Sequence, residues 1–453
     1  MFSSDEYDTS FYVVSKQNNP MIKRITDLSG GEMRVDPGLG VDTHLDLLER
    51  HLDDIDLTIC PHEKTIMAGL RDHIVDEGLE VPMTFPTSTF ALERSKILQR
   101  KLFPAEYNPR WRAFQPSRYS VRTDLIEDVK VWVDELGGAC NAVFKPDSPT
   151  AGKGVAVGGE HFGSFSELKE LYISTMGEPF IIEERFDGVE SSCQIWYNGS
   201  IGHMKGHRYP ETRDYKRAFE GDKGPNTGGM GCYMDNKSRL PYMIEGDWEA
   251  GARLAEKTVK NTEEWAEQNG IDTSGMHPCM YYLAMAHPGK VFEGNIGRPG
   301  DPEDILPLYT MKNDLIDLYF NLIEGSPTRL EFEKKAIVLV YVVPPTYGGK
   351  MQYSDEITLN FERVLNPEQG VPAFYPGDVE SRGVDKIYFK SSRSIAVTAK
   401  ADSLEEASEM AHAGAEKIES LAKPKGLIWH RRDIATRPHI EGSIRRRKAL
   451  KST

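Results

Sequence analysis

The chain has 453 residues, of which 39% are hydrophobic and 28% are charged, and its formal net charge is −15. This length predicts two to four compact units, and the composition is typical of a soluble globular protein, without any run of about 18 uncharged apolar residues that would predict a transmembrane helix. The acidic balance argues against a nucleic-acid-binding protein, and the polar start MFSSDEYDTS lacks the basic and apolar parts of a secretory signal.

The first 90 residues or so alternate between short apolar runs and amphipathic segments. We expect strands at Phe11–Ser15 and Asp56–Cys60, and helices at Met21–Leu28, His44–Leu52 and Lys64–Glu77. Strands that alternate with helices favour a parallel sheet. The sequence therefore predicts an α/β domain at about residues 1–90.

Denser motifs follow between residues 91 and 330. We expect helices at Thr87–Leu102 and Asp247–Gln268, and strands at Ala142–Lys145, Val155–Val157 and Pro179–Glu184. A last unit at residues 331–438 opens with the β-branched run Ala336–Val343 and closes with a strand at Ser394–Ala399 and a helix at Ser403–Ser420. Ser403 and Glu406 have the spacing of a capping box, which predicts where that helix begins.

Two compositional details concern compartment and partners. Five scattered cysteines without zinc-like spacing predict reduced thiols in a cytoplasmic protein: Cys60, Cys140, Cys193, Cys232 and Cys279. The tail at residues 439–453 is basic, with Arg445, Arg446, Arg447, Lys448 and Lys451. The plain expectation is a solvated, mobile terminus, and the alternative is an electrostatic contact with a phosphate-rich partner.

Two motifs have the residue types of a nucleotide site. Lys145 precedes the loop at residues 149–154, where Lys153 lies between two glycines whose amides can approach a phosphate, although such a loop also occurs as a plain hairpin turn. The apolar strand ending in Glu183 and Glu184 is followed by a glycine turn and Glu190. It can present backbone groups to an adenine and a carboxylate to a ribose, or simply be a strand with a solvated acidic end.

Two further motifs have the residue types of a ligand and metal site. Asp214-Tyr-Lys-Arg217 is followed by Gly224–Gly231, in which four glycines form a loop that can surround a small ligand, and packing does not require so many glycines. Glu293 and Asn295 are two residues apart on a strand and therefore share a face, as Mg²⁺ bridged to phosphates would require. Arg298 can then meet a carboxylate or phosphate bidentately, although Glu-x-Asn alone is common.

In this order the motifs resemble those of phosphoribosylamine–glycine ligases, ATP-grasp carboxylate–amine ligases of purine synthesis. The resemblance covers roughly residues 55–435 and is carried by Lys96, Lys145, Ala151–Gly154, Glu183, Glu184, Glu190, Asp214–Arg217 with one change, Gly224–Gly231 without change, Glu293, Asn295, Arg298, Gly300–Glu303, Ser394–Ser420 and Arg431–Ile434.

The resemblance implies an α/β protein in which an ATP-grasp domain at residues 91–330, with a mobile lid at about 120–188, follows a Rossmann-like domain and precedes an α+β C-terminal domain. It implies that ATP phosphorylates the carboxylate of glycine and that an amine acceptor then attacks the acyl phosphate. Apart from the resemblance, we expect a monomer or homodimer whose partners are these small molecules, without membrane contact and with nucleic acid at most at the basic tail.

It also implies residue roles. The ATP contacts would be Lys96, Lys145, Lys153, Glu183, Glu184 and Glu190; the Mg²⁺ or Mn²⁺ ligands Glu293 and Asn295; the substrate contacts Asn226, Thr227, Gly228, Gly229, Met230, Arg298 and Asp301; and the catalytic groups Lys153, Arg298, Asp214 and Lys216.

The sequence departs from the family pattern on the acceptor side. The family's Gly-Ser-Gly-Gly loop, which holds the sugar phosphate, is replaced by Lys16-Gln-Asn-Asn-Pro20, and its Gly-Pro-Glu reads Cys60-Pro-His-Glu63. Its Gly-Gly-Arg reads Ser391-Ser-Arg393. Three functions stay open: the purine ligase, a relative with a changed acceptor such as a modified nucleotide, and a nucleotide-binding protein without catalysis.

Overall fold

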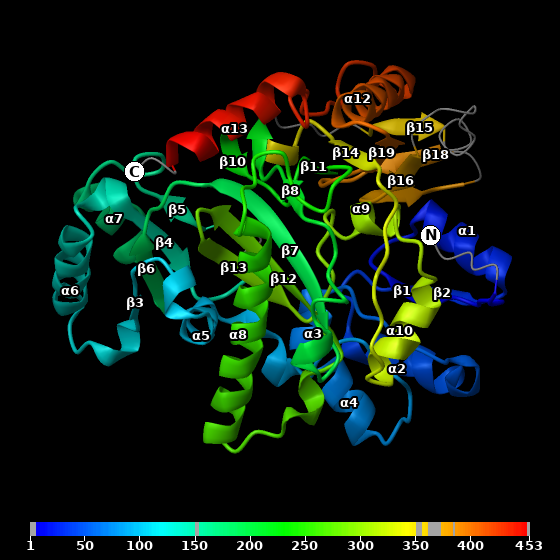
Figure 1. Ribbon diagram of the computed structural model, residues 1–453, viewed down its shortest axis with the longest axis horizontal. Helices are drawn as coiled ribbons and strands as arrows, with labels where there is room; N and C mark the ends of the chain where they lie inside the picture. The colour runs from blue at the N-terminus through cyan, green and yellow to red at the C-terminus, as the bar shows by residue number, and fades with distance from the viewer. Residues whose placement is uncertain (1–5, 150–153, 350–355, 361–372, 384–385, 451–453) are drawn as a thin grey trace.

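An eight-stranded antiparallel sheet forms the centre of the molecule (Figure 1). The computed structural model describes residues 6–149, 154–349, 356–360, 373–383 and 386–450. In spatial order the strands of the central sheet are β13 (Lys290–Ile296), β12 (Cys279–His287), β7 (Val189–Tyr197), β8 (Thr212–Asp214), β11 (Gly231–Met234), β14 (Ala336–Val342), β19 (Ile395–Ala401) and β16 (Ala373–Pro376).

The two faces of this sheet differ in chemistry. One face carries apolar side chains that pack against the long helix α8 (Asp247–Gln268), including Ile195, Leu283 and Ile296. Glu190, Ser192 and Asp214 lie on the opposite face. The pairing of β7 with β8 and β12, and of β8 with β11, places these three residues on the same side of the sheet, because side chains alternate along each strand. Packing of the first face against α8 thus leaves the polar side chains on the second, where Ser192 and Asp214 are buried.

A separate four-stranded sheet projects from one side of the molecule, on the left in Figure 1. Its strands are β3 (Trp111–Phe114), β6 (Phe180–Glu184), β4 (Ala142–Pro146) and β5 (Ala156–Val157), and the helices on it are α6 (Arg122–Glu135) and α7 (Phe165–Leu168). Its core lies between the sheet and these helices and includes Phe114, Val129 and Phe180. Because neighbouring residues on a strand face opposite sides, Lys145 and Glu183 point away from α6, toward the rest of the protein.

The N-terminal part contains less regular structure than the sequence predicts. It consists of the parallel pair β1 (Tyr12–Ser15) and β2 (Glu32–Val35) with the helices α1 (Pro20–Ser29), α2 (Val41–Arg50), α3 (Glu63–Met67) and α4 (Leu70–Asp76). The strand expected at Asp56–Cys60 is wrong, since only Thr58 makes an isolated parallel bridge, to Met83. The single helix expected at Lys64–Glu77 is broken at Gly69, whose φ is +87°.

The helix expected at Thr87–Leu102 is also wrong in its first half. Short 3₁₀ turns occupy residues 88–90 and 92–94, and α5 (Lys96–Leu102) begins only after Ser95, whose hydroxyl accepts a hydrogen bond from Leu98 N at 3.0 Å. The serine side chain satisfies an amide at the helix start and so fixes where the helix begins.

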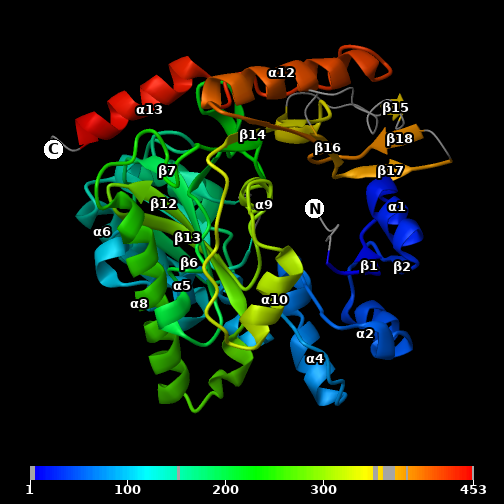
Figure 2. The same ribbon diagram turned by 45° about the vertical axis from the view of Figure 1, so that its right-hand side comes forward.

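The C-terminal elements pack beside the last strands of the central sheet (Figure 2). They comprise a three-stranded sheet of β15 (Thr358–Asn360), β18 (Lys386–Phe389) and β17 (Val379–Ser381), and the helix α12 (Leu404–Leu421). The predicted N-cap at Ser403 is confirmed, because Ser403 Oγ accepts a hydrogen bond from Glu406 N at 3.2 Å. The strands predicted at Ala336–Val343 and Ser394–Ala399 correspond to β14 and β19.

The loop after β1 contacts the C-terminal elements, and the helix that follows it, α1, lies beside β16 and β17 (Figure 2). Gln17 Nε2 donates to Val379 O at 3.1 Å, and Asn18 Nδ2 donates to Ser381 O at 3.0 Å. Asn19 caps α1 through its side-chain oxygen and donates from Nδ2 to the carbonyls of residues 376 and 377 at 2.8 and 2.9 Å. These three amides are engaged by the C-terminal elements, and Lys16 remains exposed.

The basic tail is not a mobile terminus as far as Leu450. It forms the helix α13 (Arg437–Leu450), which lies along the upper edge of the molecule in Figure 1. Arg447 is only 3% exposed and binds Asp247 at 2.9 Å, while Arg446 pairs with Asp187. The expected mobile terminus is therefore wrong as far as Leu450, because basic side chains of the tail pair with carboxylates on neighbouring elements. Lys451 lies outside the described residues.

Replacing Arg447 by alanine should destabilise the fold by about 3–5 kcal/mol, because it leaves the buried carboxylate of Asp247 without its partner. Burial alone would raise the pKa of Asp247, but the nearby His287, at 3.6 Å, and hydrogen bonds from Arg447 hold that pKa well below its usual range. The pair therefore stabilises the protein above the unfolded-state pKa of aspartate, and this stability is lost as the pH falls toward the lower folded-state pKa.

Urea unfolding of the Arg447→Ala variant at neutral and acidic pH would test this. The matched control is Arg445→Ala, since Arg445 is 72% exposed and its contact with Glu441 is 3.8 Å long. Equal stability of the two variants at neutral pH would contradict the role of Arg447.

None of the helices in the described part of the chain combines the length and the apolar character needed to cross a membrane.

Candidate functional site

The polar face of the central sheet gathers most of the residues singled out in the sequence. Glu293 is paired with Ala284 and Asn295 with Tyr282 in the β12–β13 ladder, and the same register continues to Glu190 on β7. Gly294, between the two, turns toward Phe103 and Leu283 on the apolar face. The predicted shared face of Glu293 and Asn295 is therefore present in the structure.

The side chains of Glu293 and Asn295 are half-buried. Among the described residues, none forms a side-chain hydrogen bond or ion pair with either of them. Within that same part of the chain no group of three or more His, Cys, Asp and Glu residues is arranged to hold a metal ion. One carboxylate and one amide oxygen form a donor set for a hard cation that takes its other ligands elsewhere, as Mg²⁺ does from phosphates.

A buried ionic cluster lies next to these residues on the same face. Lys216 pairs with Asp214 and lies 3.5 Å from Glu303, and Tyr282 Oη donates to Glu303 Oε1 at 2.5 Å. Desolvation raises the pKa of Asp214 to about 7, although the nearby Lys216 opposes this shift. Asp214 can therefore gain or lose a proton near neutrality.

The glycine-rich segment folds back over this cluster. Thr227 N and Oγ1 both donate to Lys216 O, at 2.7 and 2.9 Å, and Met230 N donates to Tyr215 O at 2.8 Å. Gly229 has a φ of +119°, and a Cβ there would lie 2.9 Å from Asp214 Oδ1. Asn226 ends the short hairpin of β9 (Arg217–Phe219) and β10 (Lys223–Asn226), so this glycine segment directly adjoins the ionic cluster.

Replacing Gly229 by alanine should lower both stability and any activity that depends on Asp214. The backbone conformation costs a non-glycine residue about 1–3 kcal/mol, and the new methyl group would displace the carboxylate. The control is Gly270→Ala, because Gly270 also has a positive φ, of +67°, but has nothing within 4 Å of its Cβ position. Thermal unfolding should show destabilisation of both variants, larger for Gly229→Ala because of its clash with Asp214, and ATP turnover should be lost in Gly229→Ala alone.

Arg298 lies at the end of β13, between two carboxylates. Its guanidinium is 3.4 Å from Glu93 and 3.5 Å from Glu63, and its side chain is 14% exposed. Its buried Nε has no hydrogen-bond partner among the described residues. Burial raises the pKa of Glu93 to about 7 despite the neighbouring arginine. Arg298 is thus oriented by loose ion pairs that a stronger anionic ligand can replace.

Arg393 was noted in the sequence only as a departure from a motif, yet it joins three parts of the site. It donates to the carbonyls of Gly228 and Asp301 at 2.9 and 3.0 Å, and its Nη2 lies 3.0 Å from Asp301 Oδ2. Tyr341 Oη donates to the other oxygen of Asp301 at 2.8 Å. The predicted substrate residue Asp301 is therefore held by the C-terminal elements. No sequence motif indicated a role for Glu93 or Tyr341.

The small sheet and α5 bring lysines to the edge of this face. Lys145 is buried, pairs with Glu183 and donates to Phe292 O at 3.3 Å, and Lys96 donates to Ser148 O at 2.8 Å. Desolvation lowers the pKa of both lysines, which the charge of Glu293 partly offsets. Lys153 lies outside the described residues, so the structure does not test its predicted role.

The three predicted nucleotide carboxylates have different surroundings. Glu183 is buried between Lys145 and Arg100, and Glu184 is paired with Arg110 at 3.0 Å. Glu190 is exposed to solvent, yet desolvation raises its pKa. Its carboxylate is therefore accessible to a ligand.

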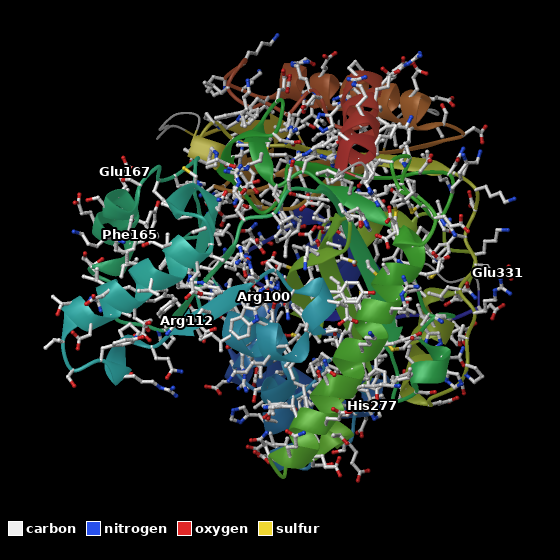
Figure 3. The ribbon with its side chains drawn as sticks, turned by 60° about the vertical axis from the view of Figure 1, so that its left-hand side comes forward. Arg100, Arg112, Phe165, Glu167, His277 and Glu331 are labelled. Carbon is white, nitrogen blue, oxygen red and sulfur yellow. The ribbon has the colours of Figure 1, made fainter. Side chains whose placement is uncertain are left out.

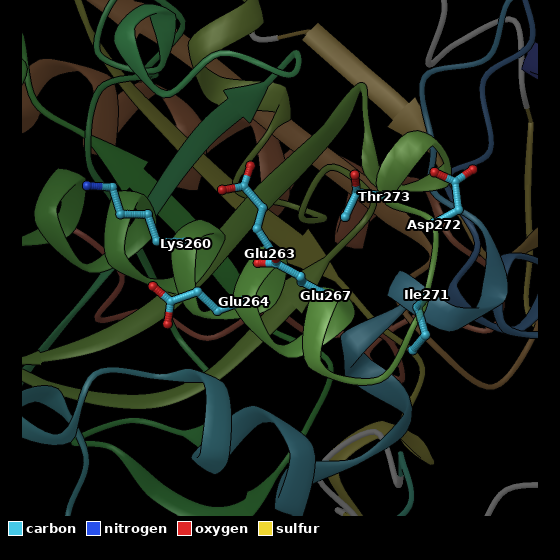
Figure 4. Close-up of a pocket in the computed structure, with 7 residues that line it drawn as sticks. All are labelled: Lys260, Glu263, Glu264, Glu267, Ile271, Asp272 and Thr273. Atoms are coloured by element: carbon cyan, nitrogen blue, oxygen red, sulfur yellow. The ribbon is translucent and has the colours of Figure 1, made fainter.

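A surface pocket beside the C-terminal end of α8 is unrelated to this site (Figure 4). It is lined by Lys260, Glu263, Glu264, Glu267, Ile271, Asp272 and Thr273. It belongs to the helix that covers the apolar face, and its four carboxylates would repel phosphates.

Comparison with known proteins places the chain in a family. A family model described as the ATP-grasp (A) domain of phosphoribosylglycinamide synthetase matches residues 111–304. The phosphoribosylamine–glycine ligase of Pyrococcus abyssi is 31% identical over 445 residues, which cover 97% of this chain and 92% of that protein. The enzyme of the same name from Thermococcus kodakarensis is 31% identical over 98% of this chain and 95% of that protein.

Solved structures share the fold. The crystal structure of phosphoribosylamine–glycine ligase from Thermotoga maritima superposes with a TM-score of 0.65 at 21% identity and covers 94% of both chains. The N5-carboxyaminoimidazole synthase of Aspergillus clavatus, in complex with ADP and an aminoimidazole ribonucleotide, superposes with a TM-score of 0.56 at 12% identity over 90% of this chain and 92% of that chain. The ATP-grasp fold expected from the sequence is confirmed.

Proposed function

This chain belongs to the phosphoribosylamine–glycine ligase family, and we propose that it joins glycine to phosphoribosylamine with cleavage of ATP to ADP and phosphate. It is an ATP-grasp ligase of purine biosynthesis. The observation that carries the residue assignments is the shared face of the central sheet, on which Glu190, Asp214, Glu293 and Asn295 lie in register. Lys96 and Lys145 adjoin this face from α5 and the small sheet.

ATP fits the charges at this face. Lys96, Lys145 and Lys153 would neutralise its phosphates, and the exposed carboxylate of Glu190 would accept hydrogen bonds from the ribose hydroxyls. Glu293 and Asn295, whose side chains the described residues leave unbonded, would hold Mg²⁺ or Mn²⁺. The bound ion would supply positive charge to the phosphates, which otherwise repel the substrate carboxylate.

We assign the ligation step to three groups of this chain. Arg298 would bind and orient the carboxylate of glycine, exchanging its loose contacts with Glu63 and Glu93 for a bidentate one. The glycine-rich segment at residues 227–230 would lie beside the acyl phosphate. When the acceptor nitrogen attacks the acyl carbon, phosphate leaves with the bonding electrons, and the nitrogen loses a proton. Asp214, with a pKa near 7 and next to Lys216, is suited to accept that proton.

A changed amine acceptor is the second candidate, and one observation favours it. The loop at residues 16–19 replaces the family's phosphate-binding loop, and its three amide side chains donate to residues 376–381 instead. Of that loop, Lys16 is the exposed side chain that could meet a phosphate. The acceptor phosphate would therefore be bound differently from the family pattern.

The decisive experiment measures ADP release with ATP, Mg²⁺ and glycine, with and without phosphoribosylamine. ADP release only in the presence of both substrates supports the purine ligase. ADP release with glycine and a different amine, but not with phosphoribosylamine, supports the changed acceptor. Tight ATP binding without turnover on any amine would reject catalysis and leave a nucleotide-binding protein.

A further inference from the structure

Arg100 lies where the small sheet, α5 and the central sheet meet, and it is 3% exposed. Figure 3 shows it on α5, between the small sheet that carries Arg112 and the long helix α8. All five of its N–H groups have acceptors. Nε and Nη2 bind the carboxylate of Glu183 at 2.8 and 3.2 Å, and Nη1 donates to Asn108 Oδ1 at 3.3 Å.

The remaining two donors reach the strand that carries the candidate metal ligands. Nη1 donates to Val291 O at 3.1 Å, and Nη2 donates to Phe292 O at 2.7 Å. Phe292 immediately precedes Glu293, and its carbonyl also accepts a hydrogen bond from Lys145. One guanidinium therefore connects the beginning of β13 to β6 of the small sheet.

Among the fully buried groups around Arg100 the charges do not cancel, and the half-buried Glu293 offsets them only in part. Two buried cations, Arg100 and Lys145, share the single buried carboxylate of Glu183. A buried excess of positive charge is unfavourable unless an anion approaches, since the interior screens charge poorly. Such a cluster is suited to an anion that arrives only when a ligand binds.

We infer that Arg100 is a positioning residue for the ATP site. It acts through Glu183, which fixes the ammonium of Lys145, and through the carbonyls that fix the strand segment before Glu293. The inference rests on the proposed contact between Lys145 and the ATP phosphates. It also reassigns Glu183: this carboxylate is buried between two cations and does not contact the nucleotide itself.

An arginine is required because the arrangement needs a planar fork. Lysine has the same charge but offers three donors from one point, so it cannot bridge Glu183, Asn108 and two carbonyls of β13 together. The variant Arg100→Lys therefore keeps the charge and removes the geometry. Losing hydrogen bonds to charged groups should weaken ATP binding by about tenfold to a hundredfold.

The experiment compares the wild-type chain with Arg100→Lys, Lys145→Met and the double variant. ATP binding is measured directly by calorimetry, and KM is measured for ATP and for glycine. We expect weaker ATP binding and a higher KM for ATP in both single variants, with the KM for glycine unchanged. In the double variant the two losses should combine to less than their product, because Arg100 acts through Lys145.

The matched control is Arg208→Lys. Arg208 is also a buried arginine, 6% exposed and paired with Glu211, and it lies 3.6 Å from the ring centre of Trp248. This control should lower the thermal midpoint but leave ATP binding unchanged. If Arg100→Lys does not fold, Glu183→Gln provides the same test, because it keeps the shape of the carboxylate and removes its charge; wild-type ATP binding by that variant overturns the inference.

The outcomes distinguish a failure of this inference from a failure of the proposed function. Wild-type ATP affinity in Arg100→Lys, with weakened binding in Lys145→Met, overturns the inference and leaves the proposed function standing. Equal loss of ATP binding in Arg208→Lys also overturns it, because the effect would then be one of general stability. Failure of the wild-type chain to bind ATP overturns the proposed function together with the inference.

Discussion

Replacing Glu293 by alanine should reduce turnover by at least about 10³-fold while the fold stays intact. The expected loss follows because a bound metal ion contributes several kcal/mol of charge stabilisation to phosphoryl transfer, and each 1.4 kcal/mol corresponds to a factor of ten. The fold should survive because the side chain is half-buried and no described residue hydrogen-bonds to it. Removing it therefore leaves no buried group without a partner.

The measurement is steady-state ADP release at increasing Mg²⁺, together with thermal unfolding. The control is Glu324→Ala, because Glu324 is an exposed glutamate at the end of α10 (Leu315–Ile323). Turnover in the control should equal that of the wild-type chain. Normal activity of Glu293→Ala at ordinary Mg²⁺ concentration would reject Glu293 as a metal ligand.

The second large effect is expected at Arg298. Arg298→Lys should lower kcat/KM for glycine by about 10²–10³-fold, the usual consequence of losing one fixed donor to a developing charge. Lysine keeps the charge but cannot bind a carboxylate bidentately. Direct binding of ATP should be unchanged. An equal loss in ATP affinity would assign Arg298 to the nucleotide half of the site.

The pH dependence of glycine use should report the partner of Arg298. Burial raises the pKa of Glu93 to about 7, so below that pH Glu93 is largely neutral and competes little for Arg298. As the pH rises through 7, Glu93 becomes charged and competes with the substrate carboxylate, so KM for glycine should rise. The variant Glu93→Gln should abolish this rise, and an unchanged pH profile would contradict the competition.

The raised pKa of Glu93 also makes stability depend on pH, in the direction opposite to the effect of Asp247. A carboxyl whose folded-state pKa is raised binds its proton more tightly in the native state. Stability therefore falls as the pH rises from about 4 to about 7. Glu93→Gln should remove this part of the pH dependence of unfolding.

Elements with local signals were predictable from the sequence. The apolar stripe of Asp247–Gln268 gave the bounds of α8, and the capping box at Ser403 gave the start of α12, because both depend on residues three or four apart. The shared face of Glu293 and Asn295 was predictable for the same reason, since strand alternation has a period of two. Each of these signals involves residues that are close in the chain.

Features that depend on distant residues were not predictable. Which of Glu183 and Glu184 faces Lys145 was not predictable, because neighbours on a strand face opposite sides and only the pairing of β6 with β4 shows that it is Glu183. The docking of α13 depends on Asp247, 200 residues earlier, which a reading of basic composition could not anticipate. The domain boundaries near residues 90, 330 and 438 stay predictions.

The contacts of the loop at residues 16–19 also constrain synthesis of the chain. Gln17 Nε2 and Val379 O are 362 residues apart in the sequence, so the first elements to be translated acquire these partners only when the last quarter of the chain has been made. Until then the side-chain N–H groups of residues 17–19 lack their acceptors at residues 376–381, and α1 lacks its neighbours β16 and β17. Because contacts of such long range form late, α1 can pack against β16 and β17 only when translation is nearly complete.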